Sequence, residues 1–369
     1  MTDASRSTPF ADALGPEKIV RLHDGACGLN AILVIDNTAV GPSLGGVRMT
    51  LDGSEEECFR LARAMTLKNA MAGLAHGGGK SIILADPALP ADGKRRLLLA
   101  FARAIRDIRD YIPGPDMGTN ETAMALIRNQ IGRAAGLPRE VGGIPLDEIG
   151  ATGFGLCVAL EAAQAHSGVN LAGARVVIQG FGSVGRHAAR FLSQRGATIV
   201  GVSDSVGARA VADGFDLEQL IAWKDAGHSV TTFAQGTAID EATLLATECD
   251  IWIPAARPDV ITAASATTMR THIIAQGANI PATAEAEALL ARQGVLVLPD
   301  FVANAGGVIC AAVEYAHGSQ AQALATIDER IRTNVQAMLD RVRQNHELPR
   351  EAAFAIARER VQRAMQWRD

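Results

Sequence analysis

The sequence predicts an α/β protein of two domains, the second of which is built on a doubly wound parallel sheet. Three observations predict this fold class. The chain has 369 residues, of which 48% are hydrophobic, and this is enough for two separate cores. Strand-like and helix-like segments alternate along most of its length. In the second half, a glycine-rich turn joins a strand-like run to a helix-like one.

The first alternating series lies before about residue 150. Residues 32–37 and 81–86 are short β-rich runs, and residues 55–73 and 95–108 carry apolar side chains at helical spacing. A passage rich in proline and glycine, residues 111–122, then leads into another predicted helix. We expect residues 1–150 to form an N-terminal α/β domain.

Five further β-rich runs follow, separated by segments long enough for helices. They are residues 174–179, 197–204, 249–254, 271–277 and 295–300. Strands that alternate with helices are typical of a parallel sheet with right-handed crossovers, so residues 151–334 are predicted to form the doubly wound domain. The tail from about Gln320 is expected to form two helices, and the part from about 335 to 369 to pack back on the first domain.

Composition and charge exclude several kinds of partner. The formal net charge of −5 offers no attraction to nucleic acid or to an anionic membrane surface. No apolar stretch is long enough for a membrane span, and the N-terminus lacks the pattern of a secretory signal. We therefore expect a cytoplasmic protein.

Neither the cysteines nor the histidines predict a metal site. The five cysteines lie far apart and include no C-x-x-C pair, so we expect small core residues in a reducing compartment. They are Cys27, Cys58, Cys157, Cys249 and Cys310. The histidines are scattered without metal-ligand spacing, and His76, just before a glycine turn, is interpreted as structural. We predict no metal.

A G-x-G-x-x-G turn follows the run 174–179 and opens a helix. Its residues are Gly180, Phe181, Gly182, Ser183, Val184 and Gly185. In a Rossmann domain the first glycine makes the tight turn, the second lets a pyrophosphate approach the backbone, and the third lets the helix pack closely on the strand. The helix N-terminus supplies free N–H groups to the phosphates. The alternative is an ordinary glycine-rich β–α turn.

The acidic residue that such a site requires is Asp204, at the end of the run 197–204. A carboxylate there binds the ribose hydroxyls and repels a 2′-phosphate, so NAD is the predicted cofactor. Arg209, a few residues later, could soften this preference and admit NADP. The alternative for Asp204 is a solvated turn residue.

Two lysines of the first half lie in apolar or glycine-rich surroundings. Lys68 lies in the helical run 55–73, and Lys80 follows three glycines and immediately precedes the run 81–86. Lysine is rarely buried without a partner, and burial favours the neutral amine, the form that acts as a base. Asp116, in a rigid Pro/Gly loop, is the best candidate partner. The alternatives are two surface lysines and a turn or helix-capping aspartate.

Seven segments in order make the chain resemble the glutamate/leucine/phenylalanine/valine dehydrogenase family, from about Gly41 to Glu314. They are GPSLGGVRM, MTLKNAMAGLAHGGGKSIIL, PGPDMGTNE, ATGFG, VVIQGFGSVGRHAA, AQGANIP and ANAGGVICAAVEYA. The GGGK and PDMGT segments are specific to the family, whereas the glycine turn is not. The resemblance implies a substrate-binding and oligomerisation domain at the N-terminus, a Rossmann domain for NAD, and a homo-oligomer.

The resemblance also implies a role for each matching residue. Lys80 matches the catalytic lysine, Asp116 the catalytic aspartate, and Lys68 the lysine that holds the substrate α-carboxylate. The other matches are Gly45 and Gly46 for the same carboxylate, Thr152 and Asn279 for the nicotinamide end of the cofactor, and Asn304 for the substrate. The implied reaction is the reversible oxidative deamination of an L-amino acid to a 2-oxo acid and ammonia, with hydride transfer to the nicotinamide.

The side-chain pocket departs from the glutamate branch of the family. Glutamate dehydrogenases carry a lysine where this chain has Leu44 and a serine where it has Ala311. Without these partners a second substrate carboxylate would be buried unpaired, so glutamate is not expected. Leu44, Val308 and Ala311 predict an apolar pocket, and Gly114, beside Pro115, leaves room for an aromatic side chain. An aromatic or branched aliphatic amino acid is therefore predicted.

Other interpretations stay open. Residues 201–216 look more like the glutamate branch, although they belong to the cofactor domain. A catalytically silent Rossmann protein that senses the dinucleotide is one alternative, and the presence of both lysines and Asp116 speaks against it. Reductive amination of an oxo acid with a primary amine in place of ammonia is another.

Overall fold

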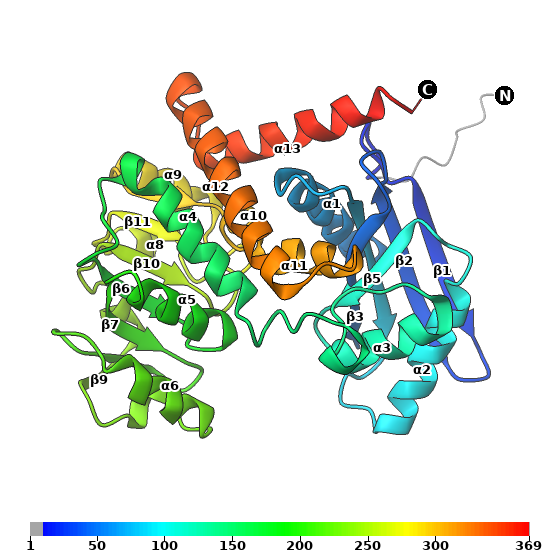
Figure 1. Ribbon diagram of the computed structural model, residues 1–369, viewed down its shortest axis with the longest axis horizontal. Helices are drawn as coiled ribbons and strands as arrows, with labels where there is room; N and C mark the ends of the chain where they lie inside the picture. Colours follow the sequence, from blue (N-terminus) through cyan, green and yellow to red (C-terminus); the bar gives the residue numbers. More distant parts are fainter. Residues whose placement is uncertain (1–9, 369) are drawn as a thin grey trace. The chain divides into compact units, whose positions relative to one another are not determined.

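The computed structural model describes residues 10–368, and the chain divides into two compact units (Figure 1). Unit 1 comprises Met1–Pro145, Ala311–Gln320 and Ile356–Asp369, and unit 2 comprises Leu146–Cys310 and Ala321–Ala355. Each unit contains a β-sheet and helices, so the α/β class predicted from the sequence is confirmed.

Unit 1 is built on a five-stranded mixed sheet in the order β1-β2-β4-β3-β5. The strands are β1 (Lys18–Asp24), β2 (Leu29–Asn37), β3 (Ser43–Thr50), β4 (Gly77–Leu84) and β5 (Tyr111–Pro115). Strands β3, β4 and β5 are parallel to one another, whereas β2 runs antiparallel to both of its neighbours. The carboxyl ends of β3 and β5 therefore lie side by side.

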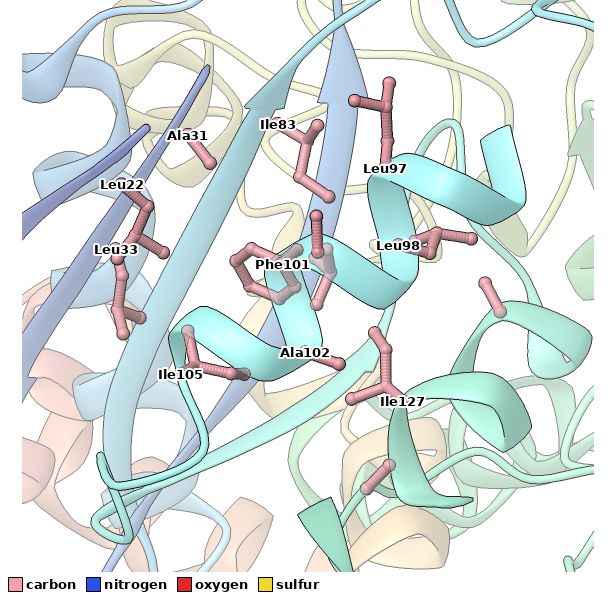
Figure 2. Close-up of a cluster of buried hydrophobic side chains, with 14 of the residues drawn as sticks. Leu22, Ala31, Leu33, Ile83, Leu97, Leu98, Phe101, Ala102, Ile105 and Ile127 are labelled. Atoms are coloured by element: carbon pink, nitrogen blue, oxygen red, sulfur yellow. The ribbon is translucent and has the colours of Figure 1, made fainter. Parts of the chain in front are cut away.

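Helices cover both faces of this sheet. They are α1 (Glu55–Met71), α2 (Ala91–Ala104) and α3 (Glu121–Ile131), and a 3₁₀ turn follows at Arg139–Val141. Side chains of β2 alternate between the faces, as the period of a strand requires. Leu33 belongs to the buried cluster that contains Phe101 of α2 (Figure 2), whereas Ile32 and Val34 pack with Phe59 of α1.

One predicted boundary in unit 1 is wrong, and one passage predicted as a loop contains a strand. The strand predicted at residues 81–86 begins at Gly77, so the three glycines and Lys80 lie inside β4 rather than before it. A Cβ at Gly78 would lie 2.0 Å from the backbone nitrogen of Thr66 in α1, so close helix–sheet packing requires glycine there. The Pro/Gly passage at 111–122 begins as strand β5, which is at the edge of the sheet, where proline is tolerated.

Unit 2 is built on a seven-stranded sheet in the order β12-β11-β10-β6-β7-β8-β9. The five predicted runs form parallel strands, namely β6 (Arg175–Gln179), β7 (Thr198–Ser203), β10 (Ile251–Pro254), β11 (Ile273–Ala275) and β12 (Leu296–Leu298). The sequence did not predict β8 (Ala208–Ala210) and β9 (Thr237–Ile239), which are antiparallel. Both are three residues long and carry no apolar run.

Helices connect the strands of unit 2. They are α4 (Ala151–Ser167), α5 (Ser183–Ser193), α6 (Leu217–Asp225), α7 (Glu241–Leu245), α8 (Ala263–Ala266), α9 (Ala284–Arg292) and α10 (Asp300–Ala303), with a 3₁₀ turn at Val230–Thr232. The strand order reverses between β6 and β10, which start the two halves of the sheet. In doubly wound folds such a reversal marks the ligand-binding edge.

The division between the units differs from the predicted boundaries at 150 and 334. Three helices complete the chain, namely α11 (Gly306–Tyr315), α12 (Gln320–Asn345) and α13 (Pro349–Met365). The boundaries at 310/311 and 355/356 fall inside α11 and α13. An unbroken helix gives no composition signal where the chain passes from one unit to the other. Of the tail predicted to pack on the first domain, residues from 356 onward belong to unit 1 and residues 335–355 to unit 2.

The described residues contain no helix long and apolar enough to cross a membrane. Within residues 10–368 no group of three or more His, Cys, Asp or Glu side chains is placed to hold a metal ion. All five cysteines are free thiols.

Candidate active site

Lys80 and Asp116 form an ion pair across strand β3 of unit 1. Lys80 lies in β4 and is 6% exposed, and its Nζ is 2.6 Å from Oδ2 of Asp116, which directly follows β5. Gly46 of β3 lies between them. A Cβ at Gly46 would lie 2.7 Å from Cβ of Asp116 and 3.1 Å from Nζ of Lys80, so the absence of a side chain there lets the pair form.

The turn that carries Asp116 is fixed by Thr119. Its hydroxyl donates to the Val47 carbonyl at 2.8 Å and accepts from the Asp116 backbone N–H at 3.0 Å. Burial raises the pKa of the Asp116 carboxyl. The charge and hydrogen bond of Lys80 more than offset this effect, with help from Met117 N–H, so the net pKa lies below its usual value.

Arg48 is a second cation on Asp116 that the sequence analysis did not identify. Its Nε lies 3.2 Å from Oδ2 of Asp116, and its Nη1 lies 2.9 Å from Oε1 of Glu57 in α1. The signal that could have found it is strand periodicity, because Arg48 and Gly46 are two residues apart in β3. Residues 43–50 contain three small residues and no β-rich run, so β3 was not predicted.

The remaining predicted substrate residues of unit 1 surround the same strands. Lys68 is half-buried in the last turn of α1. The next residue, Asn69, donates to the carbonyls of Leu44 at 3.2 Å and Gly77 at 2.7 Å, and so ties α1 to β3 and β4. A Cβ at Gly45 would lie 1.7 Å from a β4 carbonyl, so this backbone approaches its neighbour as closely as glycine permits.

The proposed side-chain pocket residues of unit 1 differ in burial. Leu44 is 3% exposed and Ala311 is half-buried, while Pro115 lies at the end of β5. A Cβ at Gly114 would meet only two carbonyl oxygens, each at 4.0 Å, so the backbone leaves room there. His76 is buried, its Nδ1 lies 3.2 Å from the Pro42 carbonyl, and burial lowers its pKa.

The glycine turn of unit 2 has the geometry of a phosphate-binding turn. Gly180 has φ +92°, and a Cβ at Gly185 would lie 2.1 Å from the Gly180 carbonyl, so both positions require glycine. Gly182 caps α5 without a side-chain hydrogen bond, and a Cβ there would meet nothing within 4 Å. Free N–H groups and open space at a helix N-terminus fit a pyrophosphate. Ser183 and Val184 form the first turn of α5, and Phe181 is buried.

A pocket of ≈ 980 Å³ opens at this turn, at the reversal between β6 and β10. Its walls carry three acidic and three basic side chains, namely Asp204, Asp240, Glu241, Arg186, Lys224 and Arg257. The charges of the two signs are balanced in number, so the net charge of the pocket neither attracts nor repels a 2′-phosphate.

Asp204 lines the pocket, but its carboxylate already accepts four hydrogen bonds. Oδ1 accepts from Val206 N and Ser229 Oγ, both at 3.0 Å, and Oδ2 accepts from Lys224 Nζ at 2.7 Å and Val230 N at 2.9 Å. Burial raises the pKa of Asp204, but these donors outweigh burial and lower it to about 2. The carboxylate therefore holds two loops together.

The contacts of Arg209 differ from those expected of a residue beside the cofactor. Its guanidinium donates to three backbone carbonyls, those of Thr231, Gln235 and Gly236. These bonds fix residues 231–236 against β8. The sequence placed Arg209 near Asp204 by distance along the chain, and the antiparallel strand β8 turns its side chain toward this loop instead.

In unit 2, Asn279, predicted to contact the nicotinamide, is a neighbour of Asn304, predicted to contact the substrate. Asn304 Nδ2 donates to Asn279 Oδ1 at 3.0 Å and to the Gly277 carbonyl at 3.2 Å. A Cβ at Gly307 would lie 3.1 Å from Oγ1 of Thr152, which places the start of α11 against α4. Val308, the next residue of α11, is half-buried.

A buried ionic network that the sequence analysis missed fixes the loop beside Asn279. Arg350 Nη1 lies 2.9 Å from Oδ1 of Asp300, and Arg350 Nη2 lies 2.8 Å from Oε1 of Glu287. Oδ2 of Asp300 accepts the Ile280 N–H at 3.0 Å, and Ile280 has a φ of 48°. A non-glycine residue in this left-handed conformation is held there by its surroundings.

Comparison with known proteins identifies the family. Residues 142–368 match the profile described as Glutamate/Leucine/Phenylalanine/Valine dehydrogenase, and residues 16–133 match Glu/Leu/Phe/Val dehydrogenase, dimerisation domain. The NADP-specific glutamate dehydrogenase of Saccharolobus shibatae is 35% identical over 90% of this chain and 83% of its own. The NAD-specific glutamate dehydrogenase of Staphylococcus aureus is 35% identical over 95% of this chain and 89% of its own.

A solved structure agrees with this assignment. The hetero-hexameric glutamate dehydrogenase from Thermus thermophilus, in its leucine-bound form, superposes with a TM-score of 0.84 at 27% identity, over 96% of this chain and 90% of that one. The resemblance stated from the sequence motifs is thereby confirmed, together with the two-domain fold. This chain belongs to the Glutamate/Leucine/Phenylalanine/Valine dehydrogenase family and is an amino-acid dehydrogenase, an oxidoreductase that acts on CH–NH2 groups.

Proposed function

We propose that this chain catalyses the reversible oxidative deamination of an apolar L-amino acid, aromatic or branched aliphatic, to its 2-oxo acid and ammonia. The observation that carries the proposal is the Lys80–Asp116 pair, held at 2.6 Å over Gly46 in unit 1. A buried amine and a carboxylate at this distance are suited to moving protons during C–N bond cleavage.

Each residue of this pair has a distinct task in the proposed reaction. A bound nicotinamide would supply the hydride acceptor, and loss of the hydride from the substrate Cα would leave an iminium. Lys80 takes a proton from the water that attacks this carbon, and its ammonium form stabilises the developing alkoxide. Asp116 carries protons to and from the substrate nitrogen. Lys68 and the backbone of Gly45 and Gly46 hold the α-carboxylate.

The cofactor is proposed to be NAD, with NADP possible. The open backbone at Gly182 and the uncapped start of α5 support a pyrophosphate site. Asp204 supports NAD through its negative charge, and its ion pair with Lys224 weakens that discrimination. The relatives include both an NAD-specific and an NADP-specific enzyme.

The apolar substrate is supported by residue chemistry. The relatives reported above are glutamate dehydrogenases, yet this chain carries Leu44 and Ala311 where that branch carries a lysine and a serine. A distal carboxylate would meet no charged partner at these positions, which is unfavourable. Val308 adds a further apolar side chain, and Asn304 contributes an amide for the substrate's polar end.

The decisive experiment is a rate profile over all amino acids with NAD and with NADP, followed at the absorbance band of the reduced nicotinamide. We expect the highest kcat/KM for an aromatic or branched aliphatic substrate. A maximum at glutamate would contradict the apolar pocket, and activity only with a primary amine plus an oxo acid would favour the reductive coupling. If the protein binds the cofactor but turns over no substrate, the remaining interpretation is a catalytically silent protein that senses the dinucleotide.

Lys80→Ala tests the chemistry itself. We expect turnover to fall by at least about 10³-fold, because the general base is lost, while NADH fluorescence still reports cofactor binding. Lys68→Ala should chiefly raise KM for the amino acid. Retained turnover in Lys80→Ala would remove this lysine from the mechanism.

Gly114→Val tests the size of the pocket. A Cβ at this position would meet no atom closer than 4.0 Å, so the variant is expected to fold. It should lower kcat/KM for aromatic substrates by about tenfold more than for valine or alanine, because it shortens the cavity. An equal loss for all substrates would argue against a pocket at Gly114.

The assembly is also part of the proposal. Residues 16–133 match a dimerisation domain, and we propose that the chain forms a homo-oligomer through unit 1. Sedimentation should give a mass that is a multiple of 38.6 kDa, and a monomer at micromolar concentration would contradict this.

A further inference from the structure

We propose that Arg48 is a positioning residue that fixes the Asp116 carboxylate against Lys80 and returns it to the ionised form after each proton transfer. The inference rests on the proposed function, since that function gives Asp116 its role in proton transfer. It adds a residue that neither the motifs nor the comparisons assign.

The register of the sheet places Arg48 beside Asp116. Strands β3 and β5 are parallel, and Val47 pairs with Pro115. The residues that follow them, Arg48 and Asp116, are therefore adjacent. Oδ2 of Asp116 lies 3.2 Å from Nε of Arg48 and 2.6 Å from Nζ of Lys80. One carboxylate oxygen therefore accepts from two cations.

Arg48 is itself anchored at its far end. Its Nη1 lies 2.9 Å from Oε1 of Glu57, whose own N–H is capped by the Ser54 hydroxyl at 3.1 Å. The Arg48 side chain is 19% exposed. A planar guanidinium that bridges two carboxylates in this way has little freedom to turn, and it fixes the direction of both.

The two cations on Asp116 differ in one respect that matters for the reaction. In the proposed mechanism Lys80 gives up and regains a proton in each turnover, so its charge is intermittent. Arginine keeps its charge at every accessible pH. Arg48 therefore favours the ionised form of Asp116 even at the moment when Lys80 is neutral, so that Asp116 releases each proton it takes up from the substrate nitrogen.

Of the other ionisable groups near Asp116, namely Lys80, Glu57 and Tyr111, none supplies a permanent positive charge beside it. From β4 the carboxyl faces Lys80, and from β3 it faces Arg48, while Glu57 of α1 lies behind Arg48. Tyr111 of β5 is fully buried, and burial raises the pKa of its phenol far above neutral, so it carries no charge. Both neighbouring cations lower the pKa of Asp116.

The test measures the protonation of Asp116 without requiring turnover. A water-soluble carbodiimide with an amine nucleophile labels the acid form of a carboxyl, and peptide mass spectrometry quantifies the label on Asp116 as a function of pH. Arg48→Met should move this labelling profile upward by about one pH unit, because an opposite charge at hydrogen-bond distance is lost. Arg48→Gln, which keeps a polar side chain, should give the same shift, and Arg48→Lys should largely restore the original profile.

Arg21→Met is the matched control. Arg21 pairs with Glu55 in the same first turn of α1 that holds Glu57, but it does not contact Asp116. Its removal should leave the labelling profile of Asp116 unchanged. An unshifted profile in both Arg48→Met and Arg48→Gln would overturn the proposal.

Turnover separates this proposal from the proposed function. If both are right, the acidic limb of kcat/KM against pH moves upward in Arg48→Met together with the labelling profile, while KM for the cofactor stays constant. If the wild-type chain deaminates no amino acid, the proposed function fails, and the labelling profile still decides the role of Arg48. A shifted labelling profile with an unshifted acidic limb would overturn the catalytic part of the inference.

Discussion

Gly46 shows how a single missing side chain lets the Lys80–Asp116 ion pair form. Lys80 reaches Asp116 across β3 because the strand between them has no Cβ at that point. The ion pair lowers the pKa of Asp116 against the opposing effect of burial. A buried pair of this kind is fixed by its geometry, since each charge depends on the other for compensation.

Gly46→Ala is therefore expected to damage catalysis more than folding. The added methyl would push against Asp116 and Lys80, so kcat should fall by about tenfold or more, as misplacement by about an ångström commonly does. Steady-state kinetics checks this. Gly93→Ala is the control, because a Cβ at Gly93 in α2 meets nothing within 4 Å. Equal kcat values in the two variants would disprove the steric role of Gly46.

At the scale of elements, Asp204 holds the turn after β7 to the 3₁₀ turn at Val230–Thr232. Its carboxylate pKa of about 2 lies below the ordinary value of 3.8. A carboxyl whose pKa is lowered by folding stabilises the fold at any pH above its unfolded-state pKa. This stabilisation is lost as the pH falls through its folded-state pKa. The pH window is therefore from about 4 down to about 2.

Asp204→Asn should lower the Tm of unit 2 by about 3 °C near neutral pH. The substitution replaces a charged acceptor by a neutral amide, and the hydrogen bonds that it accepts become weaker. The difference from the wild type should shrink as pH falls from about 4 to about 2, since the wild-type carboxylate also becomes neutral there. Calorimetry at several pH values measures this. Asp52→Asn, at an exposed position, is the control, and a difference that grows on acidification would contradict the assignment.

Arg350 acts on the loop that carries Asn279. Arg350→Met would leave Asp300 and Glu287 buried without their cation, which costs about 3–5 kcal/mol when a buried pair is broken. We expect a lower Tm and a higher KM for NAD, because the Ile280 turn loses its support. Arg343→Met removes an arginine whose pair with Asp340 is exposed, and it should change neither value. Equal effects of the two substitutions would refute the network's role.

At the scale of the whole molecule, both cores enclose thiols. Four of the five cysteines are buried, and burial raises the pKa of Cys58, Cys157 and Cys249 to about 12. The thiolate is the reactive form, so these groups should be inert while the units are folded. Cys27, which is only half-buried, is the exception.

A thiol titration with an aromatic disulfide reagent near pH 8 should therefore count one fast thiol in the native protein and all five in denaturant. Cys27→Ser should remove the fast phase and leave the Tm almost unchanged. More than one fast thiol would show that one of the cores opens readily under native conditions.

The sequence by itself determined the elements whose pattern is local. The parallel strands of unit 2, the glycine turn before α5 and helices α1 and α2 follow from apolar periodicity and turn chemistry, which act between near neighbours. The family motifs carried Lys68, Lys80 and Asp116 as candidates. Lys80–Asp116 was the one pair of interacting side chains that the sequence suggested.

Only the tertiary structure decided the contacts between distant segments. Arg48 reaches Asp116, and Arg350 reaches Asp300, because strands and helices far apart in the chain pack side by side. It also decided that β4 begins at Gly77, that the Asp204 carboxylate is saturated by donors from two loops, and that α11 and α13 each belong to both units. The physical reason is that burial and ion pairing depend on three-dimensional neighbours, which a periodic pattern along one segment does not specify.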